Sequence, residues 1–138
     1  MERQMTKSPH EIVNPESLYS PRGFAHAVVA APGRTVYLGG QIGVRADGSL
    51  PDDLVEQFDQ ACANLVEALS AAGGEPEHLV SLQIFATDVG EYAARMEEIG
   101  EAYRKHFGKH YPAMALLATF ELFEPGAHVE LVGTAVVT

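Results

Sequence analysis

The clearest hydrophobic pattern in this chain has the period of an α-helix. Between residues 54 and 69, apolar side chains fall at offsets 0, 1, 4, 7, 8, 11, 12 and 15, the stripe of a helix that buries one face. Residues 51–53, Pro-Asp-Asp, place acidic groups at the positive end of this helix, and Gly73-Gly74 ends it. We predict a helix whose stripe faces the core. The stripe consists of Leu54, Val55, Phe58, Ala61, Cys62, Leu65, Val66 and Leu69.

A second helical pattern runs from about Glu91 to Phe107. Its apolar face is made of Tyr92, Met96, Ile99, Tyr103 and Phe107. Short apolar runs bounded by turn residues predict strands elsewhere in the chain. These runs cover residues Phe24–Ala30, Thr35–Gly40, Leu79–Thr87, Ala113–Phe120 and His128–Val137. The turn at Pro32-Gly33-Arg34 predicts that the first two strands form a hairpin.

The order of these elements, β-β-α-β-α-β-β, predicts an α+β fold in which both helices pack on one face of a mixed sheet. Residues 1–22, which hold three prolines among polar groups, predict an extended N-terminal arm before a single domain at 23–138.

The last two predicted strands are apolar on both faces. Because strand side chains alternate, Met114, Leu116, Ala118 and Phe120 point one way, and Ala115 and Leu117 point the other. In the final strand, Leu131 and Val137 lie opposite Val132 and Val136. Helices on one face would leave the second face as a large exposed apolar patch. We therefore expect the chain to form oligomers.

Composition and charge narrow the classes of function. The chain has 138 residues, one cysteine, and nine basic against nineteen acidic residues, a net charge of −10. Nucleic-acid binding draws most of its affinity from Lys and Arg, so a nuclease or RNA-binding role is disfavoured. A single cysteine excludes an internal disulfide, and neither a signal sequence nor an apolar membrane span is present. We expect a soluble cytoplasmic protein that binds neither nucleic acid nor membranes.

Two segments carry a resemblance to a known family. They are Val36–Gly43, followed by the turn Ala46-Asp47-Gly48-Ser49, and Tyr111–Val137, which contains Leu122-Phe123-Glu124-Pro125. From about Tyr19 to Val137 the chain resembles the Rid superfamily of reactive-intermediate deaminases, also called the YjgF family and once labelled L-PSP endoribonucleases. The resemblance implies a chorismate-mutase-like fold, a homotrimer whose sheets enclose a central barrel, and a small-molecule pocket at each subunit interface.

Met114, in the run Tyr111-Pro112-Ala113-Met114, departs from the family pattern. Typical members carry an arginine there, which forks two hydrogen bonds to a substrate carboxylate. Such a charge-assisted pair contributes about 1.5–3 kcal/mol. A methionine thioether has no proton to donate. The usual 2-imino acid substrates should therefore bind poorly.

Three other positions also differ from the family pattern. His26 stands where typical members carry a pocket tyrosine, and Gly39 where they usually carry serine or threonine. Their last strand has two glutamates spaced by two residues, of which the second reaches the catalytic water. Here the first is present as Glu130 and the second is Val132. The pocket has been rebuilt at several points.

We predict His26 and Glu130 as the catalytic residues, because imidazole and carboxylate groups suit proton transfer near neutral pH. Five further residues should bind substrate: Gly39, Phe85, Met114, Ala115 and Val132. The alternatives are a structural histidine, an interface glutamate and a methionine that only packs. Cys62, on the helical stripe, is expected to be inert.

No cofactor or metal is expected. The histidines His106 and His110 have ligand-like spacing, but Gly108 lies between them, where the helix should end. The sequence contains no phosphate loop, nucleophile elbow or dinucleotide fingerprint.

Two functions remain open. One is hydrolysis or deamination of a reactive C=N or enamine compound that lacks the usual carboxylate; His26 would position or deprotonate water, Glu130 would assist proton transfer, and backbone amides near Ala115 would polarise the substrate. The other is a trimer that binds a metabolite, or regulates a partner, without chemistry.

Overall fold

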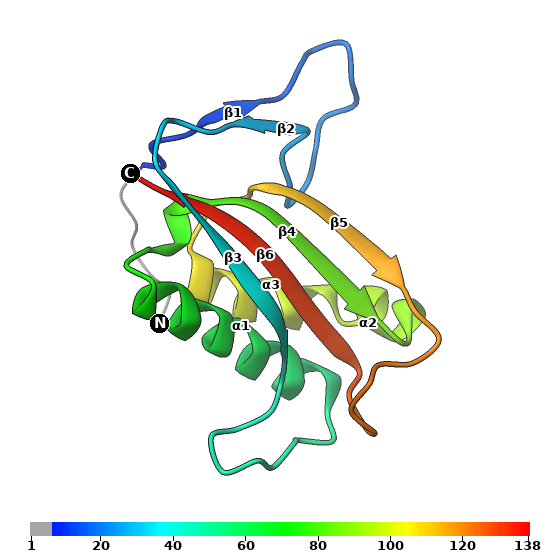
Figure 1. Cartoon of the computed structure of the whole chain (residues 1–138). Coiled ribbons are helices and arrows are strands. Elements are labelled where there is room, and N and C mark those ends of the chain that lie inside the picture. Colours follow the sequence, from blue (N-terminus) through cyan, green and yellow to red (C-terminus); the bar gives the residue numbers. More distant parts are fainter. Residues whose placement is uncertain (1–6) are drawn as a thin grey trace.

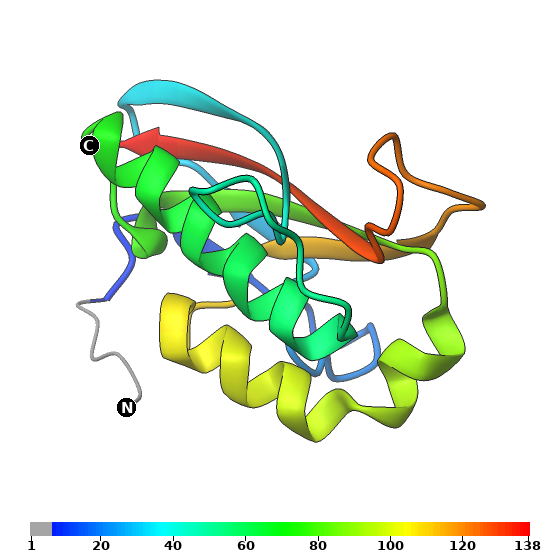
Figure 2. The same ribbon diagram turned by 90° about the horizontal axis from the view of Figure 1, so that it is seen from below.

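A four-stranded mixed sheet with a layer of helices on one face forms the body of the molecule (Figures 1 and 2). The computed structural model describes residues 7–138. The strands lie in the order β3 (Arg34–Ile42), β6 (Val129–Val137), β4 (Leu79–Ala86) and β5 (Ala113–Ala118). β6 runs antiparallel to β3 and β4, and β5 runs parallel to β4 at the edge of the sheet. The predicted α+β class is confirmed.

α1 (Leu54–Ala71) forms for the local reasons visible in its sequence. One carboxylate oxygen of Asp53 accepts the backbone N–H groups of Val55 and Glu56, each at 3.1 Å, and so caps the helix. Past its other end, Gly73 has φ 89°, a left-handed conformation that glycine adopts at little cost. The apolar stripe of α1 packs against β3 and β6.

The second predicted helix is two helices, α2 (Val89–Ala94) and α3 (Met96–Phe107). The chain leaves helical geometry at Arg95, where φ is −115°, and the prediction of Met96 on the buried face is wrong because its side chain is 51% exposed. Of the helices within residues 7–138, none is long and apolar enough to cross a membrane.

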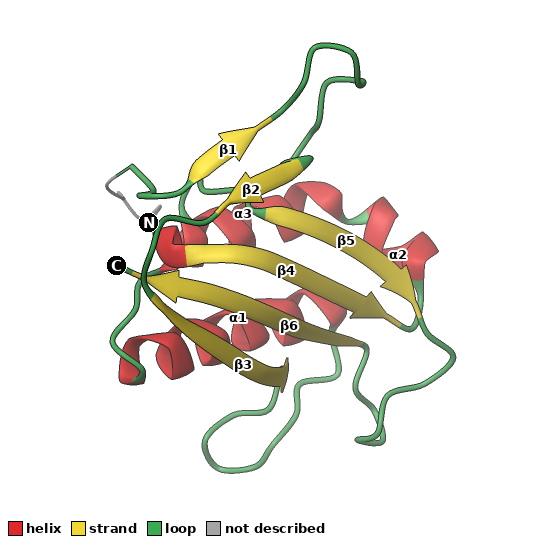
Figure 3. Cartoon of the chain, turned by 45° about the horizontal axis from the view of Figure 1, so that its top comes forward, coloured by secondary structure: helices red, strands yellow, loops and turns green. Residues whose placement is uncertain are grey.

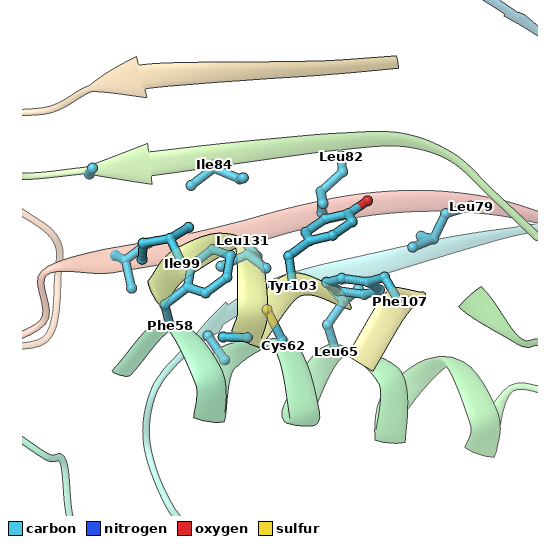
Figure 4. Packing of buried hydrophobic residues seen from close by; sticks show 14 of the residues in the cluster. Phe58, Cys62, Leu65, Leu79, Leu82, Ile84, Ile99, Tyr103, Phe107 and Leu131 are labelled. Atoms are coloured by element: carbon cyan, nitrogen blue, oxygen red, sulfur yellow. The ribbon is translucent and has the colours of Figure 1, made fainter. Parts of the chain in front are cut away.

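The core lies between the sheet and α1 and α3 (Figure 4). Phe58 and Leu65 of α1 and Phe107 of α3 are completely buried there, against Leu82 and Leu131 of the sheet. Cys62 lies in the same layer, where burial raises the pKa of its thiol well above the usual value. This thiol has the surroundings of an inert packing residue.

The predicted hairpin between residues 24–30 and 35–40 is wrong. β2 (Ala27–Val29) pairs with β1 (Glu11–Val13) from the predicted arm, in a small sheet of its own, and β3 pairs with β6 (Figure 3). β3 can bury Leu38 only by joining the large sheet, whereas β2 is mostly exposed. The part of the arm at residues 1–6 lies outside the described residues.

His10 fastens the small sheet to the large one. Its Nε2 lies 2.9 Å from the carbonyl oxygen of Val136 in β6, and its Nδ1 accepts the backbone N–H of Ala31 at 3.0 Å. The neutral ring thus donates through Nε2 and accepts through Nδ1. This histidine, only 5% exposed, has a structural role.

Candidate functional site

The register of the strands decides which face of the sheet each predicted site residue occupies. Leu131 is paired with Ile84, and Ile84 with Leu116, in a row that faces the helices. The next row, Glu130, Phe85 and Leu117, faces the opposite way because side chains alternate along each strand. We call the side of the sheet without helices the helix-free face.

Large apolar side chains are exposed on the helix-free face. Tyr37 of β3 is 82% exposed, Leu117 of β5 is 39% exposed, and Phe85 and Val132 are partly buried. The sequence-based expectation of an apolar second face is therefore met. Among the residues of β3, β4, β5 and β6 whose register places them on this face, Glu130 is the one charged residue.

The Glu130 carboxylate lies over the backbone of Gly40. A Cβ atom on Gly40 would be 2.5 Å from Glu130 Oε2 and 2.9 Å from its carboxyl carbon, so the carboxylate occupies the space that another side chain would fill. Gly40 stands in the register irregularity between Leu38 and Gln41. Within residues 7–138, no hydrogen-bond donor or cation pairs with this carboxylate.

Met114 points to the other side of the sheet. It is paired with the buried Leu82, and its Sδ is 3.9 Å from the hydroxyl of Tyr103 in α3. That hydroxyl also donates to the carbonyl oxygen of His110 at 2.7 Å. Met114 is partly buried at the edge strand, so on a single chain it cannot share a pocket with Glu130.

His26 sits beside the start of β5. Its neighbour Ala25 forms a parallel bridge with Ala113 and donates its N–H to the carbonyl oxygen of Pro112 at 2.9 Å. His26 Nε2 lies 2.8 Å from the carbonyl oxygen of Tyr19, which requires the hydrogen on Nε2. In the neutral ring of this tautomer, Nδ1 carries the lone pair and can accept a proton. The ring packs edge-on against the rings of Tyr19 and Phe24, with centroids 5.2 and 5.4 Å away.

The two predicted catalytic residues lie at opposite ends of β5. His26 follows the bridge to Ala113, whereas Glu130 shares a row with Leu117. Four residues of strand at ~3.3 Å each separate these points by about 13 Å along the strand, and β4 lies between β5 and β6. One substrate atom cannot contact both side chains of one chain.

The remaining predicted residues divide in the same way. Phe85, Ala115 and Val132 are on the helix-free face with Glu130. Gly39 is exposed, and a Cβ atom there would meet nothing within 4 Å. Sequence reasoning did not identify Gly40 as the residue over which the Glu130 carboxylate lies. The Gly39-Gly40 pair indicated an unusual backbone conformation, but only the pairing of β3 with β6 shows that Gly40 lies beside Glu130.

Two other features of residues 7–138 are less suited to carry the site. His106 Nε2 binds Asp59 at 2.8 Å and His110 Nε2 binds the carbonyl oxygen of Leu79 at 2.8 Å, so the two rings serve different partners. A groove between α1 and α3 is lined by four carboxylates, two cations, Val55 and Ala102. Much of that charge is already paired, including Asp59 with Lys105.

The loop 119–127 between β5 and β6 carries two phenylalanines that the chain leaves uncovered. Phe120 is 94% exposed and Phe123 is 99% exposed, and the loop rises on the side of the sheet away from the helices (Figure 2). The buried amide of Gln57 holds the end of the loop, since it donates to the carbonyl oxygen of Gly126 and accepts the N–H of His128. This anchored loop extends the helix-free face beyond Glu130.

Comparison with known proteins assigns the fold to a family. The sequence matches the profile of the endoribonuclease L-PSP family over residues 15–137. The chain belongs to the L-PSP family, also called the Rid family. It is similar to the Rid-family protein YyfB of Yersinia pestis, whose function is unknown, with 31% identity and a TM-score of 0.83 over 93% of this chain and 98% of that one.

Further relatives are similar along most of the chain. The 2-iminobutanoate/2-iminopropanoate deaminase of Capra hircus is 32% identical over 105 residues, 75% of this chain and 73% of the relative. Protein DfrA of Myxococcus xanthus is 30% identical over 138 residues, 99% of each chain. The YjgF gene product of Escherichia coli, at 22% identity and a TM-score of 0.66 over 91% of this chain and 94% of that one, shares the fold.

Proposed function

We propose that this Rid-family chain is a hydrolase of reactive imines or enamines that lack the usual carboxylate, working as a homotrimer with one small-molecule site at each interface between copies. The observation that carries the proposal is the unpaired Glu130 carboxylate on an otherwise uncharged apolar face. The protein would act in the cytoplasm, where its free, buried Cys62 suits a reducing environment.

The imine-deaminase relatives support the reaction class, and Met114 argues for a different substrate. A thioether donates no hydrogen bond, so Met114 cannot hold the carboxylate of a 2-imino acid. Glu130 would repel such a carboxylate. An uncharged or cationic compound with an apolar body suits the surroundings of Phe85, Leu117 and Val132.

The chemistry is a hydrolysis that needs only water. The water oxygen bonds to the carbon of a protonated C=N group, and the π electrons move to nitrogen. One proton passes from oxygen to nitrogen and the C–N bond breaks to release ammonia. The remaining hydroxyl proton passes to the ammonia, so a neutral carbonyl compound and ammonium leave. Glu130 can relay that proton, and the free Nδ1 of His26 can accept one from water.

Neighbouring copies must contribute to one site if both residues act. His26 and Met114 lie at the start of edge strand β5. Glu130 and Phe85 lie on β6 and β4, in the row that reaches Leu117 near the end of β5. In the trimer, the β5 edge of one copy would face the helix-free face of the next. Such closure would also cover the exposed Tyr37.

Product analysis tests the reaction. Freshly generated imines without a carboxylate are incubated with the purified protein, and ammonium and carbonyl products are followed. We expect release well above the spontaneous rate, with at least about a hundredfold loss in Glu130→Ala and a clear loss in His26→Ala. Imines recovered unchanged, although they bind, would replace this proposal with a non-catalytic metabolite-binding trimer.

Mixed trimers test the shared site. Chains with His26→Ala are refolded together with chains carrying Glu130→Gln, each inactive alone. If one site takes His26 from one copy and Glu130 from the next, about a quarter of the sites in random trimers are intact and activity returns. Continued inactivity of well-formed mixed trimers would show that one copy supplies both residues or that they do not act together.

A further inference from the structure

The Glu130 carboxylate is placed for a partner that the described chain does not supply. It is partly buried on the helix-free face, and within residues 7–138 it has neither an ion pair nor a hydrogen bond. Several other carboxylates of the chain are paired. Asp53 and Glu98 bind the guanidinium of Arg95, and Asp59 binds Lys105 and His106. An unpaired anion on an apolar surface favours a positively charged guest.

Gly40 gives this carboxylate its position. The missing Cβ of Gly40 leaves room for Glu130 Oε2, which lies 2.5 Å from the place a Cβ would take. Any larger residue would push the carboxylate off the backbone of β3. The glycine itself is exposed, so a guest can approach the carboxylate from solvent or from a neighbouring copy.

The neighbours of Glu130 suit an organic cation. Phe85 stands directly opposite Glu130 on β4, at a spacing where side chains touch, and Ile42 stands opposite on β3. A cation bound to the carboxylate can also lie against the Phe85 ring, which attracts positive charge. The row ends at Leu117 with an apolar surface for the body of the guest.

We propose that Glu130, seated over Gly40 and flanked by Phe85, binds the protonated nitrogen of an ammonium or iminium compound, so that the site selects cations without a carboxylate. The inference rests on the proposed function in one respect, that the helix-free face carries the site. Selectivity is thereby opposite to that of an arginine-bearing pocket, which selects anions. Gly40 is a positioning residue and Glu130 is the binding residue.

Three probes with one ring and different charges test the proposal. Benzylammonium, benzyl alcohol and benzoate are titrated into the full-length protein at neutral pH, and binding is followed by calorimetry or by NMR. We expect benzylammonium to bind about tenfold or more tightly than benzyl alcohol, and benzoate most weakly. In Glu130→Gln the preference for benzylammonium disappears. Equal affinity for the three probes, no binding of benzylammonium, or an undiminished preference in Glu130→Gln would overturn the proposal.

Substitution of two glycines by alanine tests whether the position of the Glu130 carboxylate, and not only its charge, determines binding. Gly40→Ala keeps the carboxylate but displaces it, so it should lose most of the preference for benzylammonium while the protein stays folded. Gly90→Ala, the matched control on α2, where a Cβ atom would lie 3.4 Å from Asp88 Oδ1, should keep the preference. A full preference in Gly40→Ala would remove Gly40 from the site. Shortening the acid as well, in Gly40→Ala with Glu130→Asp, should restore part of the preference by relieving the crowding.

The outcomes also separate this inference from the proposed hydrolysis. Preferential binding of benzylammonium without turnover of any imine supports the cation site and removes the hydrolase. Turnover of imines with no preference among the three probes supports the hydrolase and removes the cation site.

Discussion

The two faces of the sheet differ in where their partners lie, although neighbouring residues of the same strands build both. Leu131 and Ile84 face the helices and are 0% and 4% exposed. One residue along each strand, Glu130 and Phe85 face away and stay partly exposed. At β4 and β6 the helix-covered face is buried within one chain, and it stabilises the fold. The helix-free face has apolar groups and a carboxylate without partners, which is the signature of a surface that binds something else.

The proposed trimer would assemble through the helix-free face, so a change on that face should give the largest expected effect. Tyr37→Glu places a new charge on this face, on edge strand β3, in every copy, so the proposed trimer should dissociate to folded monomers. Sedimentation measures the mass, and circular dichroism checks the fold. Ala93→Glu, on the exposed side of α2, is the control that should leave the mass unchanged. An unchanged mass in Tyr37→Glu would move the interface elsewhere.

Alanine substitutions at two adjacent residues of β6 compare how much each face of the sheet contributes to the free energy of unfolding. Leu131→Ala should lower the free energy of unfolding by about 2–5 kcal/mol, because it leaves a cavity between the sheet and α1. Val132→Ala, one residue along on the helix-free face, should cost less than about 1 kcal/mol in the dissociated Tyr37→Glu background. Chemical denaturation measures both in that background. Equal losses would mean that the two faces do not differ in burial.

Two glycines of the same segment should respond differently to alanine. A Cβ on Gly43 would lie 2.5 Å from the Cα of Gln57, which is backbone of α1, so Gly43→Ala should cost about 1–3 kcal/mol. A Cβ on Gly40 meets only the end of a flexible side chain, so Gly40→Ala should change the free energy of unfolding by less than about 0.5 kcal/mol. Thermal and urea unfolding compare the two. A large loss of stability in Gly40→Ala would argue that Glu130 is held rigidly for structural reasons.

The smallest expected effect is a change in the pH dependence of stability. Burial lowers the pKa of His110, whose Nε2 donates to Leu79 and which is only 8% exposed. The unfolded chain therefore takes up the proton first, and stability falls as the pH drops from ~6.5 through the lowered pKa. His110→Gln removes this titration and should flatten the slope in that window. The same slope in both proteins would show that groups other than His110 cause it.

Local signals predicted α1 and the alternation along the last strands. The cap at Asp53, the stripe and the stop at Gly73 all lie within the segment, and the structure has each of them. Leu116 and Leu117 point to opposite sides, as expected from strand geometry. The hairpin prediction failed because β3 pairs with β6, about ninety residues later in the sequence, and a local turn signal cannot reveal that competition.

The candidate site shows the same limit. Alternation groups Glu130 with Val132 and Met114 with Leu116, but it does not say which group the helices cover. Only the register shows that Met114 lies on the helix side against Tyr103, and that Glu130 lies on the other side over Gly40.

The central claim is that this site keeps a carboxylate, Glu130, and lacks the arginine of an arginine-bearing pocket. The most direct measurement compares kcat/KM for two imines with the same ethyl group, 2-iminobutanoate and its carboxylate-free counterpart, the imine of propanal. The account predicts at least about tenfold faster hydrolysis of the propanal imine, and loss of that activity in Glu130→Gln. Faster hydrolysis of 2-iminobutanoate by the wild-type protein would contradict it.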